Sequence, residues 1–160
     1  MASKSFTNLQ QIEQYLKQKI NESLQVEVAE MVKDKISQHT KTDVYDKYDP
    51  VFYKRRYYDN GGLGDETRMD AKLISNGTLE VTDNNDFNHP WAYTHGGYGD
   101  IDTDKSLTYN IEYGYGDMDE PYNRPRPFIE KTREEIQGSN LHTVTMKKAL
   151  QARLGSGAVK

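Results

Sequence analysis

Apolar side chains recur at every third or fourth position along the first part of the chain. Seven positions form this repeat: Leu9, Ile12, Leu16, Ile20, Leu24, Val28 and Met31. Glutamate and lysine occupy much of the opposite face, a pattern typical of an amphipathic helix. The sequence therefore predicts a helix of about thirty residues, roughly 45 Å long, that begins at a capping box over Thr7–Gln10. We expect its apolar face to pack against a sheet, with a coiled coil as the alternative.

Strand signals follow in the middle of the chain. Apolar and polar residues alternate over Arg68–Ile74 and again over Leu79–Thr82, and an Asn-Gly pair within Ser75–Thr78 separates the two runs. This combination predicts a β-hairpin, because Asn-Gly adopts the tight turn that joins neighbouring strands. Leu107–Tyr113 alternates in the same way and predicts a further strand that faces the long helix.

Helical signals return in three other places. The Asp-Pro pair before Val51–Tyr57 suits a helix cap and first turn, and it predicts a short helix there. Phe128–Gln137 is expected to be helical, with Gly138 as its C-cap. Leu141–Leu154 is expected to form a last, weaker helix.

These elements predict an α+β fold, in which the long N-terminal helix and a C-terminal helix pack on a small, mostly antiparallel sheet. A chain of 160 residues fits one domain, which we expect to span residues 1–154, with 155–160 as a flexible tail. Asp83–Lys105 and Gly114–Glu120 are rich in glycine and acidic residues and are predicted to be loops. Long loops inside a compact domain usually have a function or are ordered by a partner.

Tyrosine dominates the aromatic content, with 12 tyrosines against 4 phenylalanines and 1 tryptophan. A tyrosine ring is apolar with a polar tip, which suits subunit interfaces; an outer layer of tyrosines on a β-rich domain is the alternative. The chain has no cysteine, which excludes disulfides and thiolate zinc sites. Because no segment approaches the ~20 apolar residues of a membrane span, we expect a soluble protein made in a cytoplasm.

The net charge of −4 conceals an uneven distribution. Residues 1–58 carry ten basic and eight acidic side chains, and residues 121–160 carry eight basic and three acidic ones. Residues 59–120 carry three basic and fourteen acidic side chains, which makes this segment an acidic block with a net charge of −11. Nucleic-acid binding requires a concentrated basic face, and the sequence supplies none.

The candidates for metal or catalytic chemistry are weak. Asp100, Asp102 and Asp104 alternate as in a calcium loop, but the glycine and the closing glutamate of such a loop are missing, and a solvated acidic loop is the alternative. His89 and His95 lie in a segment without cysteine, whereas zinc needs three or four ligands in firm geometry. We therefore expect neither an enzyme nor a bound metal or cofactor.

Two short runs concentrate the residue types that serve best as contacts between proteins. Tyr48–Tyr57 and Asn123–Glu130 are both dense in arginine, aromatic residues and proline. Arginines there can pair with carboxylates of a neighbouring subunit, with a small nucleic-acid contact as the alternative. The phenylalanine of the second run either enters an apolar site on a partner or anchors the last helix on the chain's own sheet. The predicted contact residues are Tyr53, Arg55, Arg56, Tyr57, Trp91, Arg124, Arg126 and Phe128.

These two runs also carry a resemblance to a known family. Tyr-Lys-Arg-Arg-Tyr at Tyr53–Tyr57, followed by Gly-Leu at Leu63, and Arg-Pro-Phe-Ile at Arg126–Ile129 resemble the motifs of small tail-completion proteins. These are the minor tail, neck or head–tail joining proteins of long-tailed bacteriophages and phage-like particles. The resemblance covers roughly residues 44–136.

Several properties follow from this resemblance as expectations. The fold should be similar to that of tail terminators and tube proteins, and the chain should form a homo-oligomeric ring, often six-fold. The ring should complete the tail tube and join it to the head connector, so the expected partners are other copies, the tail tube protein and the connector or neck proteins. Genome DNA would be passing cargo only. The chain would assemble in the cytoplasm of the host bacterium and reside in the tail or neck of the virion.

The acidic block would have a role in such a ring. If the ring surrounds the DNA conduit, acidic loops that line the lumen would repel phosphates and let the genome pass without binding. The predicted lumen-facing residues are Asp100, Asp102, Asp104, Asp117 and Asp119. The alternative is that these loops only keep the outer surface soluble. A different class of function also remains open, namely an acidic, tyrosine-rich protein-binding module that acts as a monomer or small oligomer and grips a basic partner, with DNA mimicry as one form of this role.

Overall fold

The computed structural model of the chain describes residues 5–47, 62–84, 107–114 and 124–155. Within these ranges the chain is rich in helix and has a small antiparallel sheet of two strands, which confirms the predicted α+β class. The short helix expected over Val51–Tyr57 lies outside the described residues, as do residues 85–105 and 115–120 of the two predicted acidic loops.

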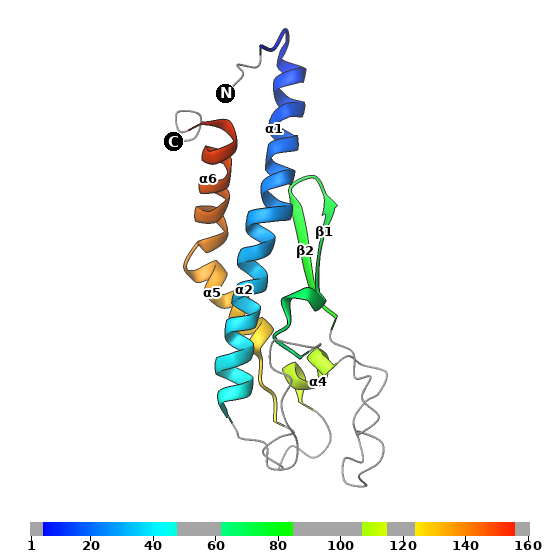
Figure 1. Cartoon of the computed structure of the whole chain (residues 1–160), viewed down its shortest axis with the longest axis vertical. Helices are drawn as coiled ribbons and strands as arrows, with labels where there is room; N and C mark the ends of the chain where they lie inside the picture. Colours follow the sequence, from blue (N-terminus) through cyan, green and yellow to red (C-terminus); the bar gives the residue numbers. More distant parts are fainter. Residues whose placement is uncertain (1–4, 48–61, 85–106, 115–123, 156–160) are drawn as a thin grey trace.

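A continuous helical spine runs from Leu9 to Lys47 along the length of the molecule (Figure 1). Its successive parts are α1 Leu9–Ser23, the π-helical turn η1 Leu24–Val28, α2 Ala29–His39, the π-helical turn η2 Thr40–Val44 and the 3₁₀ turn η3 Tyr45–Lys47. The predicted N-terminal helix is therefore confirmed, and it is longer than the apolar repeat indicated. Each π turn is wider than an α turn and rotates the residues that follow it.

The cap of the spine lies one residue later than the sequence predicts. Asn8 is the N-cap, and its side-chain oxygen accepts the backbone N–H of Gln11 at 2.9 Å. The side chain of Gln11 in turn accepts the backbone N–H of Thr7 at 3.0 Å. Asparagine caps a helix at least as well as threonine. With Asn8 as the N-cap, Gln11 stands in the third helical position, from which its side chain can reach back.

The predicted hairpin is confirmed. Strands β1 Met69–Ser75 and β2 Thr78–Asp83 pair antiparallel, and Gly77 in the turn has the left-handed φ of 81° that favours glycine. Asn21 of the spine holds this turn, because its side chain accepts the Gly77 N–H at 3.1 Å and donates to Asn76 at 3.1 Å. The spine thereby sets the position of the sheet.

The strand predicted at Leu107–Tyr113 is wrong, because these residues form the short helix α4. Tyr109 and Tyr113 are exposed, and their ring centroids lie 4.7 Å apart. Residues four apart meet on one face of a helix, so this seven-residue segment fits a helix as well as a strand. Asn110 and Glu112 are buried, which places polar side chains on the inner face and breaks the strand pattern.

The two predicted C-terminal helices are confirmed as α5 Phe128–Gly138 and α6 Leu141–Leu154. Gly138 is the last helical residue rather than the cap, and the left-handed residue between the helices is Asn140, with a φ of 53°. Figure 1 shows that α5 and α6 return along the spine, with α5 beside α2 and α6 beside α1.

The main core cluster lies where α2, η2, β1, α4 and α5 converge. Its buried residues are Ile36, Val44, Leu63, Met69, Ile111 and Phe128. The first residues of the apolar repeat, in contrast, remain exposed beyond this core: Leu9 is 84% exposed and Leu16 is 41% exposed. The expectation that the whole apolar face packs on a sheet is therefore correct only for the later part of the spine, where η1 contacts both strands. We call the exposed residues Phe6, Leu9, Ile12 and Leu16 the N-terminal stripe.

Candidate functional site

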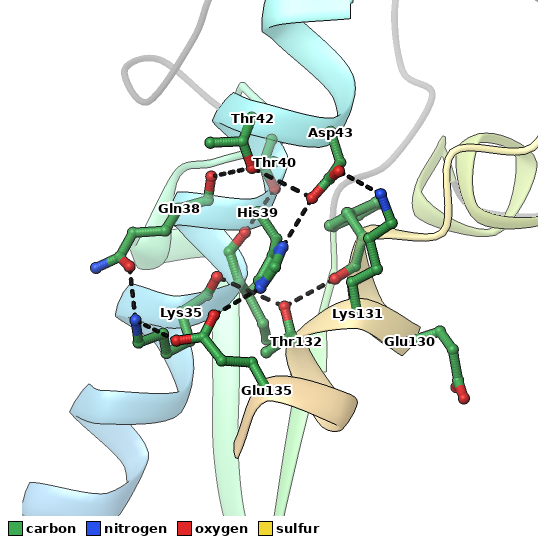
Figure 2. Close-up of polar contacts among 12 residues, drawn as sticks. Lys35, Gln38, His39, Thr40, Thr42, Asp43, Glu130, Lys131, Thr132 and Glu135 are labelled. Carbon is green, nitrogen blue, oxygen red and sulfur yellow. Dashed lines mark hydrogen bonds and ion pairs between the residues drawn. The ribbon is translucent and has the colours of Figure 1, made fainter. Parts of the chain in front are cut away.

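A polar cluster joins the spine to α5 (Figure 2). The ring of His39 lies between two carboxylates, with Nδ1 2.7 Å from Oδ2 of Asp43 and Nε2 2.8 Å from Oε2 of Glu135. Lys131 binds the other oxygen of Asp43, and Nζ of Lys35 lies 2.6 Å from the other oxygen of Glu135. All four carboxylate oxygens are thus engaged, and three of the contacts connect the spine with α5.

Two carboxylates of the cluster are shifted toward the ionised form. Burial by itself raises the pKa of Asp43, but hydrogen bonds from Lys131 and His39 and the charge of Lys131 outweigh burial, so that the pKa lies below its ordinary value. The hydrogen bond from Lys35, followed by that from His39, lowers the pKa of Glu135. Both groups are therefore anions at neutral pH and bind the cationic side chains that face them.

The cluster has the properties of a clamp rather than of a reaction centre. A general base needs an oxygen or nitrogen that can reach a substrate proton, whereas the Asp43 side chain is only 11% exposed and its oxygens already bind Lys131 and His39. His39 can donate to both carboxylates at once only when both ring nitrogens carry hydrogen. Within the described ranges, no group of three or more His, Asp or Glu side chains is arranged to hold a metal ion.

Sequence reasoning missed this cluster, although a weak signal is present. Lys35, His39 and Asp43 repeat every four residues, as do Lys131 and Glu135, so each set lines one face of its helix. Such rows are also typical of solvated helix faces. The sequence does not reveal that the two rows face each other, because His39 and Glu135 lie far apart in the chain.

A second polar contact fixes the Arg-Pro-Arg-Pro run. The buried carboxylate of Glu112 in α4 accepts the backbone N–H groups of Ile129 and Glu130 at 2.9 Å each, at the first turn of α5. These N–H groups have no partner within the helix, and the helix dipole favours an anion there. Just before this turn, the backbone N–H of Arg126 donates to the Ile111 carbonyl at 2.8 Å. The run is thereby attached to α4.

The structure locates three of the predicted contact residues. Arg124 is exposed, Arg126 is half-buried, and Phe128 is 0% exposed. The Phe128 ring belongs to the chain's own core and offers no surface to a partner in this fold, which corresponds to the alternative of an anchor for the helix. The other predicted contact residues and all the predicted lumen-facing residues lie outside the described ranges: Tyr53, Arg55, Arg56, Tyr57, Trp91, Asp100, Asp102, Asp104, Asp117 and Asp119.

An open apolar groove lies between α2, β2, α5 and the start of α6. Its volume is about 330 Å³. The apolar side chains that line it are Val32, Ile36, Val81, Ile129 and Ile136. Arg133 and His142 line it as well. We call this feature the α2–α5 groove.

Among the residues that the structure describes, no helix is both long and apolar enough to cross a membrane.

The comparisons with known proteins concern nearly the whole chain. The family model YomN matches residues 8–152, from the N-cap of α1 into the last turns of α6. A relative described as an SPbeta prophage-derived uncharacterized protein, YomN of Bacillus subtilis (strain 168), is 31% identical over 117 residues, which cover 72% of this chain and 70% of that protein. No solved structure matches the chain.

Proposed function

The chain belongs to the YomN family and is phage-derived, and from this premise we propose that it is a structural protein of the phage particle. In this proposal, copies of the chain form a ring at the neck that completes the tail tube and joins it to the head connector. The chain catalyses no reaction. The resemblance of Tyr53–Tyr57 and Arg126–Ile129 to motifs of tail-completion proteins supports this role over other roles in a phage.

The observation that carries the proposal is the N-terminal stripe. Large exposed apolar patches mark interaction sites, and here four apolar side chains are exposed along one end of the spine. This end is a formed helix, because Asn8 and Gln11 cap it and the ring of Phe6 lies 5.2 Å from that of Tyr15. A stiff, capped helix that presents apolar residues suits a subunit that assembles with others.

The polar cluster agrees with a structural role. Its carboxylates bind cations of the same chain, so it holds α5 against the spine instead of presenting reactive groups. The acidic residues Asp100, Asp102, Asp104, Asp117 and Asp119 would line the lumen in this proposal, where they would repel the passing DNA.

The test is removal of the reading frame from the phage, followed by electron microscopy and mass spectrometry of purified particles. We expect filled heads and separate tails without the protein, joined particles when the wild-type chain is supplied from a plasmid, and several copies of the chain per wild-type particle. Normal infectious particles from the deletion phage would contradict the proposal. A chain that is absent from particles and monomeric in solution would instead favour the acidic binding module.

A further inference from the structure

We propose that the N-terminal stripe of one copy docks in the α2–α5 groove of the next copy. This inference rests on the proposed function, because it supplies the contact by which copies would form a ring. The contact is heterologous, since two different surfaces of the chain meet. Repetition of a heterologous contact produces a ring when the rotation closes and a filament when it does not.

The stripe has the spacing of a helix that binds in a groove. Leu9, Ile12 and Leu16 stand at positions i, i+3 and i+7 of α1, which are the anchor positions of an amphipathic helix laid into an apolar groove. Leu9 is 84% exposed, Leu16 is 41% exposed and Phe6 is 38% exposed. Docking would remove these side chains from water, at about 25 cal/mol for each Å² buried.

The groove fits the apolar side chains of such a helix in volume and lining. Its volume of about 330 Å³ lies within the range of sites that bind a ligand or a few side chains. Ile36 contributes from the spine, Val81 from β2, and Ile129 and Ile136 from α5, so the apolar lining comes from three sides. Leucine and isoleucine side chains from a second copy match this lining.

The stripe cannot reach the groove of its own chain. Ile12 and Ile36 belong to the same unbroken helical spine, so they are held roughly 35 Å apart at ~1.5 Å per residue. A fold-back would have to break the helix at its core, where η1 and α2 pack on β1, β2 and α5. A stripe that docks in this groove therefore comes from another copy.

One charged side chain beside each surface is opposite in sign to one beside the other. Residues 5–16 contain a single charged side chain, Glu13, whereas the groove is lined by Arg133, with His142 beside it. Glu13 is paired with Lys17 at 2.6 Å, and Arg133 with Glu130 at 2.7 Å. Both are exposed pairs within one helix, which contribute little to stability, so Glu13 and Arg133 can exchange these partners for each other when copies meet.

The experiment uses one variant that blocks the stripe and one that blocks the groove. Leu9→Asp combined with Ile12→Asp places charge on the stripe, and Gln137→Trp fills the groove from an exposed position on its lining. Val26→Asp is the matched control, because Val26 is 45% exposed on the same spine but belongs to neither surface. Native mass spectrometry then gives the number of copies, and circular dichroism confirms the fold of each variant.

We expect wild type and Val26→Asp to form a multi-copy assembly, and each blocked variant to be a monomer. An equimolar mixture of the two blocked variants should form a one-to-one dimer, because one intact stripe still meets one intact groove. A mixture that stays monomeric, or a stripe variant that still assembles, overturns the contact. A stripe that pairs with a second stripe would instead leave the Gln137→Trp variant dimeric on its own, which also overturns the contact.

A charge exchange tests the orientation of the contact. Glu13→Arg alone and Arg133→Glu alone should each weaken assembly about tenfold, and the two together should restore it. Absence of restoration overturns the pairing of Glu13 with Arg133. The contact and the proposed function can fail separately. Particles that lack the chain would refute the proposed function even where the contact is found. Assembly that survives both blocking variants would refute the contact even in a neck ring.

Discussion

Arg153 in the last turn of α6 binds Glu27 of the spine, with its Nη2 atom 2.7 and 2.8 Å from the two carboxylate oxygens. Its Nε atom donates to the hydroxyl of Ser23 at 3.1 Å, and Ser23 is 0% exposed. One guanidinium thus attaches the end of α6 to the spine at two successive turns. This contact is the counterpart of the polar cluster, which attaches α5 to the spine farther along.

Arg153→Met should remove this attachment while keeping the apolar stem of the side chain. We expect a loss of about 1–3 kcal/mol in the free energy of unfolding, because hydrogen bonds to charged groups contribute about that much and the Ser23 hydroxyl loses a partner. Urea denaturation measures the loss. Lys148→Met is the control, since Lys148 is exposed on the same helix; equal effects of the two substitutions would show that the contact stabilises nothing.

The polar cluster makes stability depend on pH in the acid range. The pKa of Asp43 and that of Glu135 lie below their ordinary values of 3.8 and 4.5, so the unfolded chain binds protons more readily than the folded chain. Their contribution is therefore complete above these ordinary values and is lost as the pH falls through the lower folded-state pKa values. Glu135 is 39% exposed, so solvent screening makes its share the smaller one.

Asp43→Asn should remove part of this dependence. We expect the variant to lose about 1–3 kcal/mol at pH 7 and to show a shallower decrease in stability between pH 5 and pH 2 than wild type. Urea denaturation at a series of pH values gives both quantities. Asp46→Asn, at an exposed position one turn on, should follow the wild-type curve; a parallel decrease in Asp43→Asn and wild type would contradict the clamp.

Glu112→Ala should weaken the junction of α4 and α5. The substitution leaves the N–H groups of Ile129 and Glu130 without their carboxylate partner, and loss of a helix cap typically costs about 0.5–2 kcal/mol. Glu112→Gln keeps one acceptor and should lose less. The free energy of unfolding should therefore be lower for Glu112→Ala than for Glu112→Gln. Glu134→Ala, at an exposed position of α5, is the control. The reverse order would contradict a capping role.

The sequence predicts the elements of this fold better than their packing. Local signals sufficed for the spine, for the Asn-Gly hairpin turn at Gly77 and for α5 and α6, because periodicity and turn chemistry act over a few residues. The failure at Leu107–Tyr113 arose because seven residues satisfy both periods. Burial was harder to predict, since Leu9 has the same apolar spacing as Val28, yet Val28 is 6% exposed and Leu9 lies beyond the elements that cover the spine.

The candidate sites show the same difference between local and long-range information. Each row of the polar cluster is readable in the sequence, but the pairing of His39 with Glu135 depends on how α5 returns along the spine. An aromatic residue in an arginine- and proline-rich run is typical of a contact surface. Phe128, however, is the first residue of α5 and belongs to the core cluster. The groove has no sequence signature, since its lining comes from α2, β2 and α5.

Phe128→Ala and Leu9→Ala should therefore have very different effects, although both remove an apolar side chain. Phe128 is 0% exposed within the core cluster, and truncation of a buried phenylalanine costs about 3–5 kcal/mol. Leu9 is 84% exposed in a single copy, and surface substitutions there usually change the stability of monomeric protein by less than about 0.5 kcal/mol. Thermal and urea denaturation compare the two. A stable Phe128→Ala variant would contradict the assignment of this ring to the core.

Arg55 and Arg56 belong to the run Tyr48–Tyr57, and their effect on assembly rests on the proposed function. Arg55→Glu combined with Arg56→Glu should leave the melting temperature of the isolated chain unchanged but prevent the joining of heads to tails, because these arginines are proposed to pair with carboxylates of neighbouring subunits. Lys147→Glu combined with Lys148→Glu is the matched control, since it changes the charge equally at exposed positions of α6. Electron micrographs of particles and plaque counts measure joining. Infectious particles that carry Arg55→Glu and Arg56→Glu would show that subunit pairing does not use these residues. Loss of joining in the lysine double variant as well would show sensitivity to total charge alone.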